Sequence, residues 1–169
     1  LRLLFARAGE QHCTCCDRVV GRQSAEEIVD RILELDEGTR FQVLAPVVMN
    51  RKGEYRELFR EALKAGFTRA RVDGELVSLE DPPPLDKDFK HDIEIVVDRL
   101  VIKEGLRDRL TDSVETALRE ADGLLLVDVP GEDPQLFSEK LACPFCQLSF
   151  PDLEPSIFSF NTPLGMCVA

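Results

Sequence analysis

Apolar residues recur at helical spacing in several stretches of the chain. After Ser24 they lie three or four positions apart, which predicts a helix over residues 24–35. Ser24 is a suitable N-cap, and Glu27, three residues later, completes a capping box. The same spacing predicts two further helices and the end of a third, at residues 55–66, 106–121 and 1–9.

Short apolar runs, some of them alternating with polar residues, predict strands between these helices. The predicted strands cover residues 40–48, 67–72, 76–79, 91–103, 123–129 and 136–141. Pro46 suggests an edge or a bulge in the first strand, because proline cannot donate a ladder hydrogen bond. Asp73-Gly74 is a hairpin turn signal, residues 51–53 are predicted as a turn, and the proline-rich residues 80–89 as an exposed loop.

The order of the predicted elements indicates the fold class. From residue 41 to residue 129 it is strand, helix, strand hairpin, strand, helix, strand. This order is typical of a ferredoxin-like split β-α-β layer, in which one sheet carries its helices on one face. We therefore predict an α+β domain of this kind.

Length and charge restrict the possible functions. The chain has 169 residues, enough for one or two domains with a real core. Its net charge of −11 argues against general binding of duplex DNA by this piece alone. No apolar run approaches the ~20 residues that span a bilayer, so we expect no membrane association. The chain begins with Leu1 rather than Met, and we interpret it as a fragment of a longer protein.

Two cysteine pairs carry the most specific chemistry in the sequence. Cys13 and Cys16 form one Cys-x2-Cys knuckle near the start, and Cys143 and Cys146 form a second near the end. A knuckle supplies two thiolates, which is half of a tetrahedral zinc site. Two knuckles make a closed four-sulfur site with no position for a substrate, so we predict a structural zinc.

Other readings of the cysteines remain open. They could be buried core residues, a disulfide framework, a thioredoxin-like redox pair at Cys13 and Cys16, or ligands of another metal such as iron. The segment after Cys16 argues against the redox pair, because it does not resemble a helix start. Reduced cysteines and a metal site favour a cytoplasmic protein.

No catalytic constellation is recognisable. The chain lacks the G-x-x-x-x-G-K-[ST] phosphate loop, the G-x-G-x-x-G dinucleotide motif and the H-E-x-x-H zinc motif. His12 adjoins a knuckle and is either an outer-shell partner or a surface residue, and His91 is expected to be solvated. The carboxylates of the 91–103 strand (Asp92, Glu94 and Asp98) are also expected at the solvated surface.

Several segments together resemble the UvrA family, the damage-sensing ATPase subunits of the bacterial UvrABC excision nuclease. The matching segments are LRLLFARAGEQHC (1–13), QSAEEIVD (23–30), VLAPVV (43–48), RKGE (51–54), VDGE (72–75), VVDRL (96–100), DSVETAL (112–118), FSEKLACPFC (137–146) and residues 153–167. The resemblance covers essentially the whole chain.

This resemblance implies a domain organisation. Residues 1–22 look like the end of a signature region with the first knuckle, 23–136 like an inserted UvrB-binding domain, and 137–169 like the second knuckle and the start of the next signature segment. Cys167 looks like half of a further, truncated zinc site. The family's ATP and magnesium sites lie outside this segment, and this part is not expected to be an enzyme.

The resemblance also implies partners and contact residues. Full-length members act in nucleotide excision repair of damaged DNA within the SOS response, as homodimers that dock UvrB. Two arginines used in that docking match Arg69 and Arg99, and Arg71 would share a strand face with Arg69. Guanidinium groups suit such contacts because they pair bidentately with carboxylates.

The chain departs from the family pattern in places. Thr14 and Asp17 replace the usual Pro and Gly of the first knuckle, and Cys15 is an extra thiol that could compete as a ligand. The basic run before His91 is thinned to Lys87-Asp88-Phe89-Lys90. Three hypotheses stay open: a UvrB-docking module, a zinc module that contacts DNA directly, and a thiol oxidoreductase.

Overall fold

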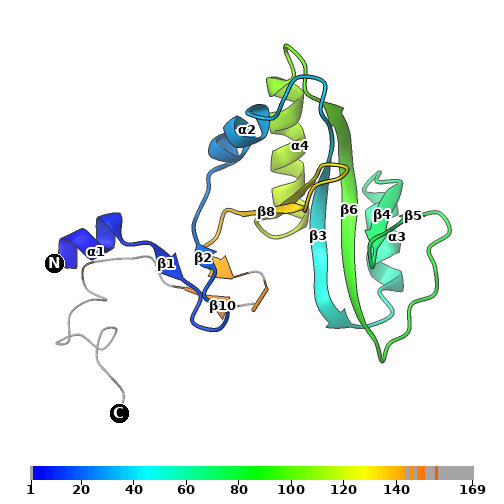
Figure 1. Ribbon diagram of the computed structural model, residues 1–169. Coiled ribbons are helices and arrows are strands. Elements are labelled where there is room, and N and C mark those ends of the chain that lie inside the picture. Colours follow the sequence, from blue (N-terminus) through cyan, green and yellow to red (C-terminus); the bar gives the residue numbers. More distant parts are fainter. Residues whose placement is uncertain (1, 144, 147, 151–154, 156–169) are drawn as a thin grey trace. The chain divides into compact units, whose positions relative to one another are not determined.

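The computed structural model describes residues 2–143, 145, 146, 148–150 and 155 (Figure 1). The chain divides into two compact units. The first, here called the terminal unit, consists of residues 1–22 and 140–169, and the second, the sheet unit, of residues 23–139. The sheet unit thus includes residues 137–139, which the sequence had assigned to the second knuckle segment.

A six-stranded antiparallel sheet dominates the sheet unit. Its strand order is β5-β4-β6-β3-β7-β8. The strands are β3 (Arg40–Lys52), β4 (Arg69–Val72), β5 (Glu75–Ser78), β6 (Lys90–Val101), β7 (Leu124–Asp128) and β8 (Gln135–Ser138). β3 and β6 are the long central pair, so the predicted bulge of β3 lies inside the sheet rather than at an edge.

The helices connect strands that are not neighbours. α3 (Arg56–Lys64) joins β3 to β4, and α4 (Arg107–Glu120) joins β6 to β7. β6 lies between the two strands that α3 joins, and β3 lies between the two strands that α4 joins. The sheet unit is therefore an α+β unit built on an antiparallel sheet.

α2 (Ala25–Leu33) begins as the sequence predicted. The Ser24 hydroxyl accepts a hydrogen bond from the Glu27 N–H, and the Glu27 carboxylate accepts one from the Ser24 N–H at 2.9 Å, so both halves of the capping box form. The apolar face of α2 packs against α4, and an Asp30–Arg107 ion pair links the two helices at the surface.

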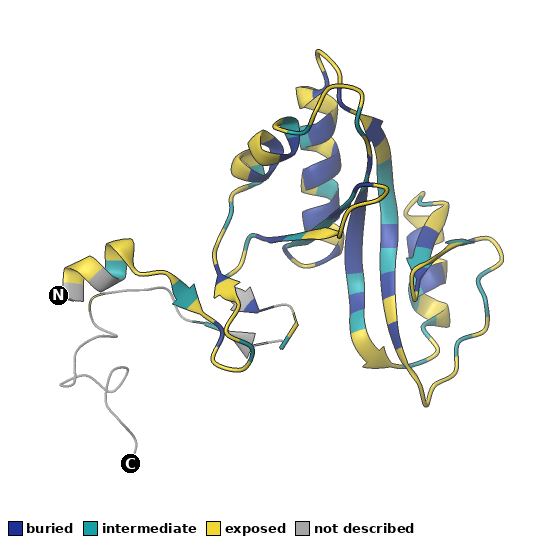
Figure 2. Ribbon diagram, in the orientation of Figure 1, coloured by how far each residue is buried: buried dark blue, intermediate teal, exposed yellow. Residues whose placement is uncertain are grey.

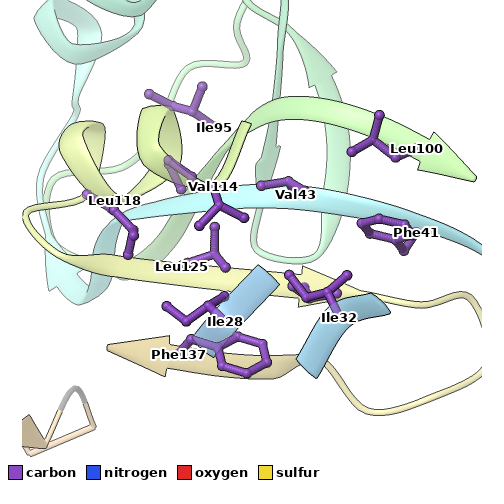
Figure 3. Close-up of a cluster of buried hydrophobic side chains, with 14 of the residues drawn as sticks. Ile28, Ile32, Phe41, Val43, Ile95, Leu100, Val114, Leu118, Leu125 and Phe137 are labelled. Atoms are coloured by element: carbon purple, nitrogen blue, oxygen red, sulfur yellow. The ribbon is translucent and has the colours of Figure 1, made fainter. Parts of the chain in front are cut away.

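The helices and one face of the sheet enclose a single hydrophobic cluster (Figure 3). Ile28 and Ile32 of α2, Val114 and Leu118 of α4, and Leu125 of β7 point toward one another there. α3 contributes the buried Phe59 to the same cluster. The dark bands of Figure 2 show buried residues along β3, β6 and α4.

The β4–β5 hairpin uses the predicted two-residue turn. Asp73 and Gly74 both have positive φ, 50° and 88°, as the twist-matched hairpin turns require. The Asp73 N–H donates to the Asp92 carbonyl, and the Asp92 N–H donates to the Asp73 carboxylate at 2.9 Å. These bonds fix the turn to the neighbouring strand β6.

Three bulges interrupt the pairing of β3 with β6, one of them directly after Pro46. Another lies where Val43 pairs with Asp98 but the next residue, Leu44, pairs with Val96, which leaves Val97 of β6 unpaired. A third lies between Val48 and Arg51. An extra residue reverses which side chains face which side of a strand.

Several surface assignments made from the sequence were wrong. Residues Arg51 and Lys52 belong to β3 rather than to a turn. His91 is buried, 8% exposed, because its Nδ1 contacts the Asp73 carboxylate at 2.7 Å and its Nε2 contacts the Asp86 carbonyl at 2.9 Å. Glu94 and Asp98 are partly buried ion-pair partners instead of solvated carboxylates. Local alternation could not reveal these partners, which lie 5 to 23 residues away.

The terminal unit contains short elements only. These are α1 (Arg2–Ala8), β1 (Gln11–His12), β2 (Val19–Val20), β9 (Ala142–Cys143) and β10 (Leu148–Ser149). β1 pairs with β2, and β9 pairs with β10, each antiparallel. Across the described residues of both units, every helix is too short or too polar to cross a bilayer.

Candidate metal centre and arginine face

The first cysteine knuckle is a tight turn between β1 and β2. The Asp17 N–H donates to the Cys13 carbonyl at 2.9 Å, and the Cys13 N–H donates to the Arg18 carbonyl at 2.8 Å. Asp17 has φ 56°, the left-handed conformation that a glycine would usually supply and that aspartate tolerates better than most residues. His12 Nδ1 contacts the Asp17 carbonyl at 2.9 Å, which braces the turn from outside.

The second knuckle begins at β9. Cys143 pairs with Leu148 of β10, and the Phe150 N–H donates to the Leu141 carbonyl at 2.8 Å. Between the strands the chain turns so that Cys146 faces the same interior as Cys143. The Arg18 guanidinium of the first knuckle stacks over the Phe145 ring of the second, 3.7 Å from its centroid.

The structure brings together all four cysteines that the sequence singled out. The Sγ atoms of Cys13, Cys16, Cys143 and Cys146 all lie within 4.8 Å of one another. The Cys16 and Cys143 sulfurs are 3.6 Å apart, close to the roughly 3.8 Å edge of a tetrahedron with Zn–S bonds of about 2.3 Å. Cys13 and Cys143 are buried and the other two are half-buried. One ion therefore fits among the four sulfurs.

The thiols are poised for a cation. Burial raises the pKa of Cys13, but N–H groups of Cys15 and Cys16 and the adjacent thiols lower it to about 7. Burial raises the pKa of Cys143, and the hydrogen bond with Cys16 raises the pKa of Cys146. Neighbouring thiolates repel one another, so the four thiols cannot all lose their protons in the absence of a cation. A bound divalent cation removes that repulsion and is coordinated by the thiolates.

The remaining candidate ligands lie differently. Cys15 is exposed and does not belong to the four-sulfur group. His12 is exposed at the surface, and its Nε2 lies 3.7 Å from the Glu10 carboxylate. The carbonyl of Asp17 and that carboxylate raise the pKa of His12. Cys167, expected to be part of a further site, lies outside the described residues.

Arg69, Arg71 and Arg99 lie on one face of the sheet, opposite the hydrophobic cluster. In β4, Arg69 and Arg71 alternate with the buried Ala70 and Val72, so both point away from the core. We call this side the arginine face. Its charged members include Arg40, Arg69, Arg71, Arg99, Glu94 and Asp128.

The Val97 bulge decides the side on which Arg99 lies. Counting strictly by twos from Glu94, which pairs with Arg71, would place Asp98 on the arginine face and Arg99 in the core. The extra residue reverses this order. Asp98 instead contacts α4, where it accepts hydrogen bonds from Arg109 and Ser113 at 3.0 Å. Sequence alternation alone could not detect the bulge.

Arg71 is held by two carboxylates. Its Nε lies 3.0 Å from the Glu94 carboxylate, and its second terminal nitrogen reaches the same group at 3.3 Å. Another nitrogen lies 3.2 Å from the Asp128 carboxylate of β7. Burial lowers the pKa of Arg71, but the hydrogen bond and charge of Glu94 outweigh this and raise it. The sequence offered no signal for the Asp128 partner.

The sheet unit matches a known family of domains. Residues 23–131 match the family model described as the UvrA interaction domain. This match covers most of the sheet unit, from α2 to the turn after β7.

Relatives extend the similarity to both units. The chain is 55% identical over 173 residues to the UvrABC system protein A of Streptomyces avermitilis. It is 53% identical over 174 residues to that of Mycobacterium tuberculosis and 51% over 168 residues to that of Clostridium acetobutylicum. Each alignment covers 99% of this chain, but only 17% or 18% of the relative. By this similarity and the domain match, the chain belongs to the UvrA family.

Proposed function

We propose that this chain is the partner-docking segment of a UvrA protein and that its sheet unit binds UvrB during nucleotide excision repair. The observation that carries this proposal is the match of the sheet unit to the UvrA interaction domain. The full-length protein would supply the ATP and magnesium sites, the dimer contacts and the encounter with damaged DNA. The segment itself has a binding role in the cytoplasm rather than a catalytic one.

The metal proposed for the terminal unit is zinc. Four thiolates at tetrahedral spacing suit zinc, and a closed four-sulfur set leaves no open position for substrate. The metal would join the two chain segments that lead into and out of the sheet unit, Leu1–Arg22 and Lys140–Ala169. Its role is thus structural, and Cys15 stays outside the ligand set.

The fold proposed for the sheet unit is ferredoxin-like. The strand order β4-β6-β3-β7, with α3 and α4 as the two crossovers, supports this proposal. β5 and β8 then extend the sheet at its two edges. Such a sheet buries one face under helices and leaves the other available to a partner.

Arg69 and Arg99 are the proposed contacts with UvrB. Both are exposed on the arginine face, and within the described chain neither side chain makes an ion pair. Arg71 lies between the same strands, but its donors already bind Glu94 and Asp128. We therefore propose that Arg71 holds Glu94 and Asp128 in place, and that Arg69 and Arg99 make the contacts with UvrB.

The test is the affinity of the 169-residue chain for purified UvrB, with Arg69→Glu plus Arg99→Glu as the variant. Its matched control is Arg31→Glu plus Arg119→Glu, which makes the same charge change on α2 and α4. Losing charge pairs at an interface costs about 2–5 kcal/mol, or roughly 30-fold or more in affinity. Equal affinity of both double variants would reject the two arginines as contacts.

A second candidate function is direct contact of the terminal unit with DNA. The unit carries five basic and four acidic residues, whereas the sheet unit carries 16 and 28. The Arg18–Phe145 stack also exposes a cation and an aromatic ring beside the knuckles. A steep fall of DNA affinity with salt, abolished by Arg18→Glu, would favour this function.

A further inference from the structure

The arginine face contains a fourth arginine, Arg40, which the sequence did not single out. Arg40 begins β3, where it pairs with Val101 of β6, and Gln42 pairs with Arg99. Arg40 is therefore the diagonal neighbour of Arg99 on the same face, roughly 7–8 Å away at the backbone. Its side chain is exposed.

The three arginines occupy adjacent strands. Arg69 lies on β4, Arg99 on β6 and Arg40 on β3, and these strands are neighbours in that order. Neighbouring strands are about 4.8 Å apart, so the three backbone positions span about 10 Å across the sheet. They are also offset along the strands, because β4 pairs Ala70 with Ile95 whereas Arg40 pairs with Val101 farther along β6, so they form a diagonal row. This spacing suits a row of carboxylates on one partner surface better than a single anion.

The carboxylates of this face do not neutralise the row. Glu94 and Asp128, the two carboxylates that lie among the arginines, both form ion pairs with Arg71. In the part of the chain that the structure describes, Arg40, Arg69 and Arg99 form no side-chain ion pair. Their charges stay available on a unit that has, in all, 28 acidic residues against 16 basic ones.

Apolar side chains flank the row. Val101, the partner of Arg40, is 40% exposed, and Leu76, the partner of Arg71, is 50% exposed. Directly paired residues share a face, so both lie on the arginine face. A surface with central charges and apolar neighbours fits a folded protein partner, in which desolvated apolar contacts accompany the ion pairs.

We propose that Arg40 is a third docking residue, and that the partner presents an acidic surface with a carboxylate for each of Arg40, Arg99 and Arg69. This inference rests on the proposed UvrB-docking function and adds the chemical character of the partner's surface. The positive charges of Arg40, Arg69 and Arg99 attract and orient the acidic surface of the partner. Arg71 binds Glu94 and Asp128, so these two carboxylates do not pair with the three docking arginines.

The experiment measures association of the 169-residue chain with purified UvrB at low and high salt. We expect Arg40→Glu to slow association about tenfold at low salt, because steering by opposite charges raises association rates. The difference should shrink at high salt, where exposed charges are screened. Arg40→Lys keeps the charge and should associate nearly as fast as the parent chain.

The control and the earlier variant separate the two proposals. Arg31→Glu makes the same charge change on α2 and should leave association almost unchanged. If Arg69→Glu plus Arg99→Glu weakens binding but Arg40→Glu behaves like Arg31→Glu, the inference about Arg40 is wrong and the docking function stands. If the chain does not bind UvrB at all, the docking function itself is rejected.

Discussion

The two units of this chain are stabilised in different ways. In the described residues, the sheet unit has a cluster of 26 buried apolar side chains, whereas the terminal unit has three buried residues, Cys13, Val20 and Cys143. Two of those three are proposed metal ligands. In its described part, the terminal unit buries too little apolar surface to offset the conformational entropy by burial alone. The comparison indicates that the sheet unit depends on its core, and it supports the proposal that the terminal unit depends on a metal.

Removing the metal should have the largest effect, and only on the terminal unit. We expect Cys143→Ser to abolish zinc binding and to unfold the knuckles, because structural zinc contributes on the order of 10 kcal/mol in small zinc domains. Metal content per chain and amide hydrogen exchange of residues 11–20 report this loss. Cys15→Ser is the control and should keep one metal per chain. Loss of exchange protection throughout β3 and β6 as well would contradict the separation.

A core truncation should produce the opposite pattern. Phe59 of α3 is fully buried in the sheet unit's cluster, and Phe59→Ala should lower its free energy of unfolding by about 3–5 kcal/mol. Urea unfolding measures the loss, and metal content should not change. Leu63→Ala on the same helix is the control, since Leu63 is 38% exposed and should cost much less. Equal costs at the two positions would show that α3 is not anchored through Phe59.

The Asp98 contact with α4 should have a smaller effect that depends on pH. Burial raises the pKa of Asp98, but hydrogen bonds from Arg109, the Arg99 N–H and Ser113 lower it below its usual value. A lowered pKa means that the contribution exists above about pH 4 and is lost as pH falls through the folded-state value. We expect Asp98→Asn to cost about 1–3 kcal/mol at pH 7.

The pH dependence of the free energy of unfolding tests whether the cost of Asp98→Asn comes from the charge of Asp98. The gap between the parent chain and Asp98→Asn should close in acid, and the exposed Asp112→Asn on α4 should show little effect at any pH. A gap that persisted at pH 2.5 would mean that the cost comes from packing rather than from the charge.

The His91 contact should have the smallest effect, with the opposite pH dependence. The hydrogen bond to Asp73 raises the pKa of His91, assisted by the Asp86 carbonyl. A raised pKa means that the contribution is complete below about pH 6.5 and is lost as pH rises through the folded-state value. His91→Asn should therefore destabilise the sheet unit by about 1 kcal/mol at pH 5.5 and less at pH 8.5. His12→Asn, in the terminal unit, is the control for urea unfolding of the sheet unit.

Features encoded within a few residues were predictable from the sequence. The capping box of Ser24 and Glu27 and the turn at Asp73-Gly74 form as expected, because their signals depend on local backbone geometry. The two knuckles were recognised from spacing, and the structure brings their sulfurs together. The chemistry of four thiolates restricted the possible pairings of these distant segments.

Features that depend on strand pairing were not predictable. Nothing local indicates that Val97 is left unpaired, yet this bulge directs Asp98 to α4 and Arg99 to the arginine face. Arg71 reaches Asp128, 57 positions later in the sequence, and Arg40 adjoins Arg99 only through the register of β3 with β6. Such contacts exist only once the sheet has assembled, so alternation along one strand cannot reveal them.

The two ends of the sheet unit lie side by side, where the Gln23 N–H donates a hydrogen bond to the Ser138 carbonyl at 2.9 Å. A segment with adjoining ends can be excised or exchanged for a homologous one without stretching the polypeptide that hosts it. The sheet unit could therefore be exchanged or removed as one piece without altering the cysteine knuckles, for example by a short Gly-Ser bridge from residue 22 to residue 140.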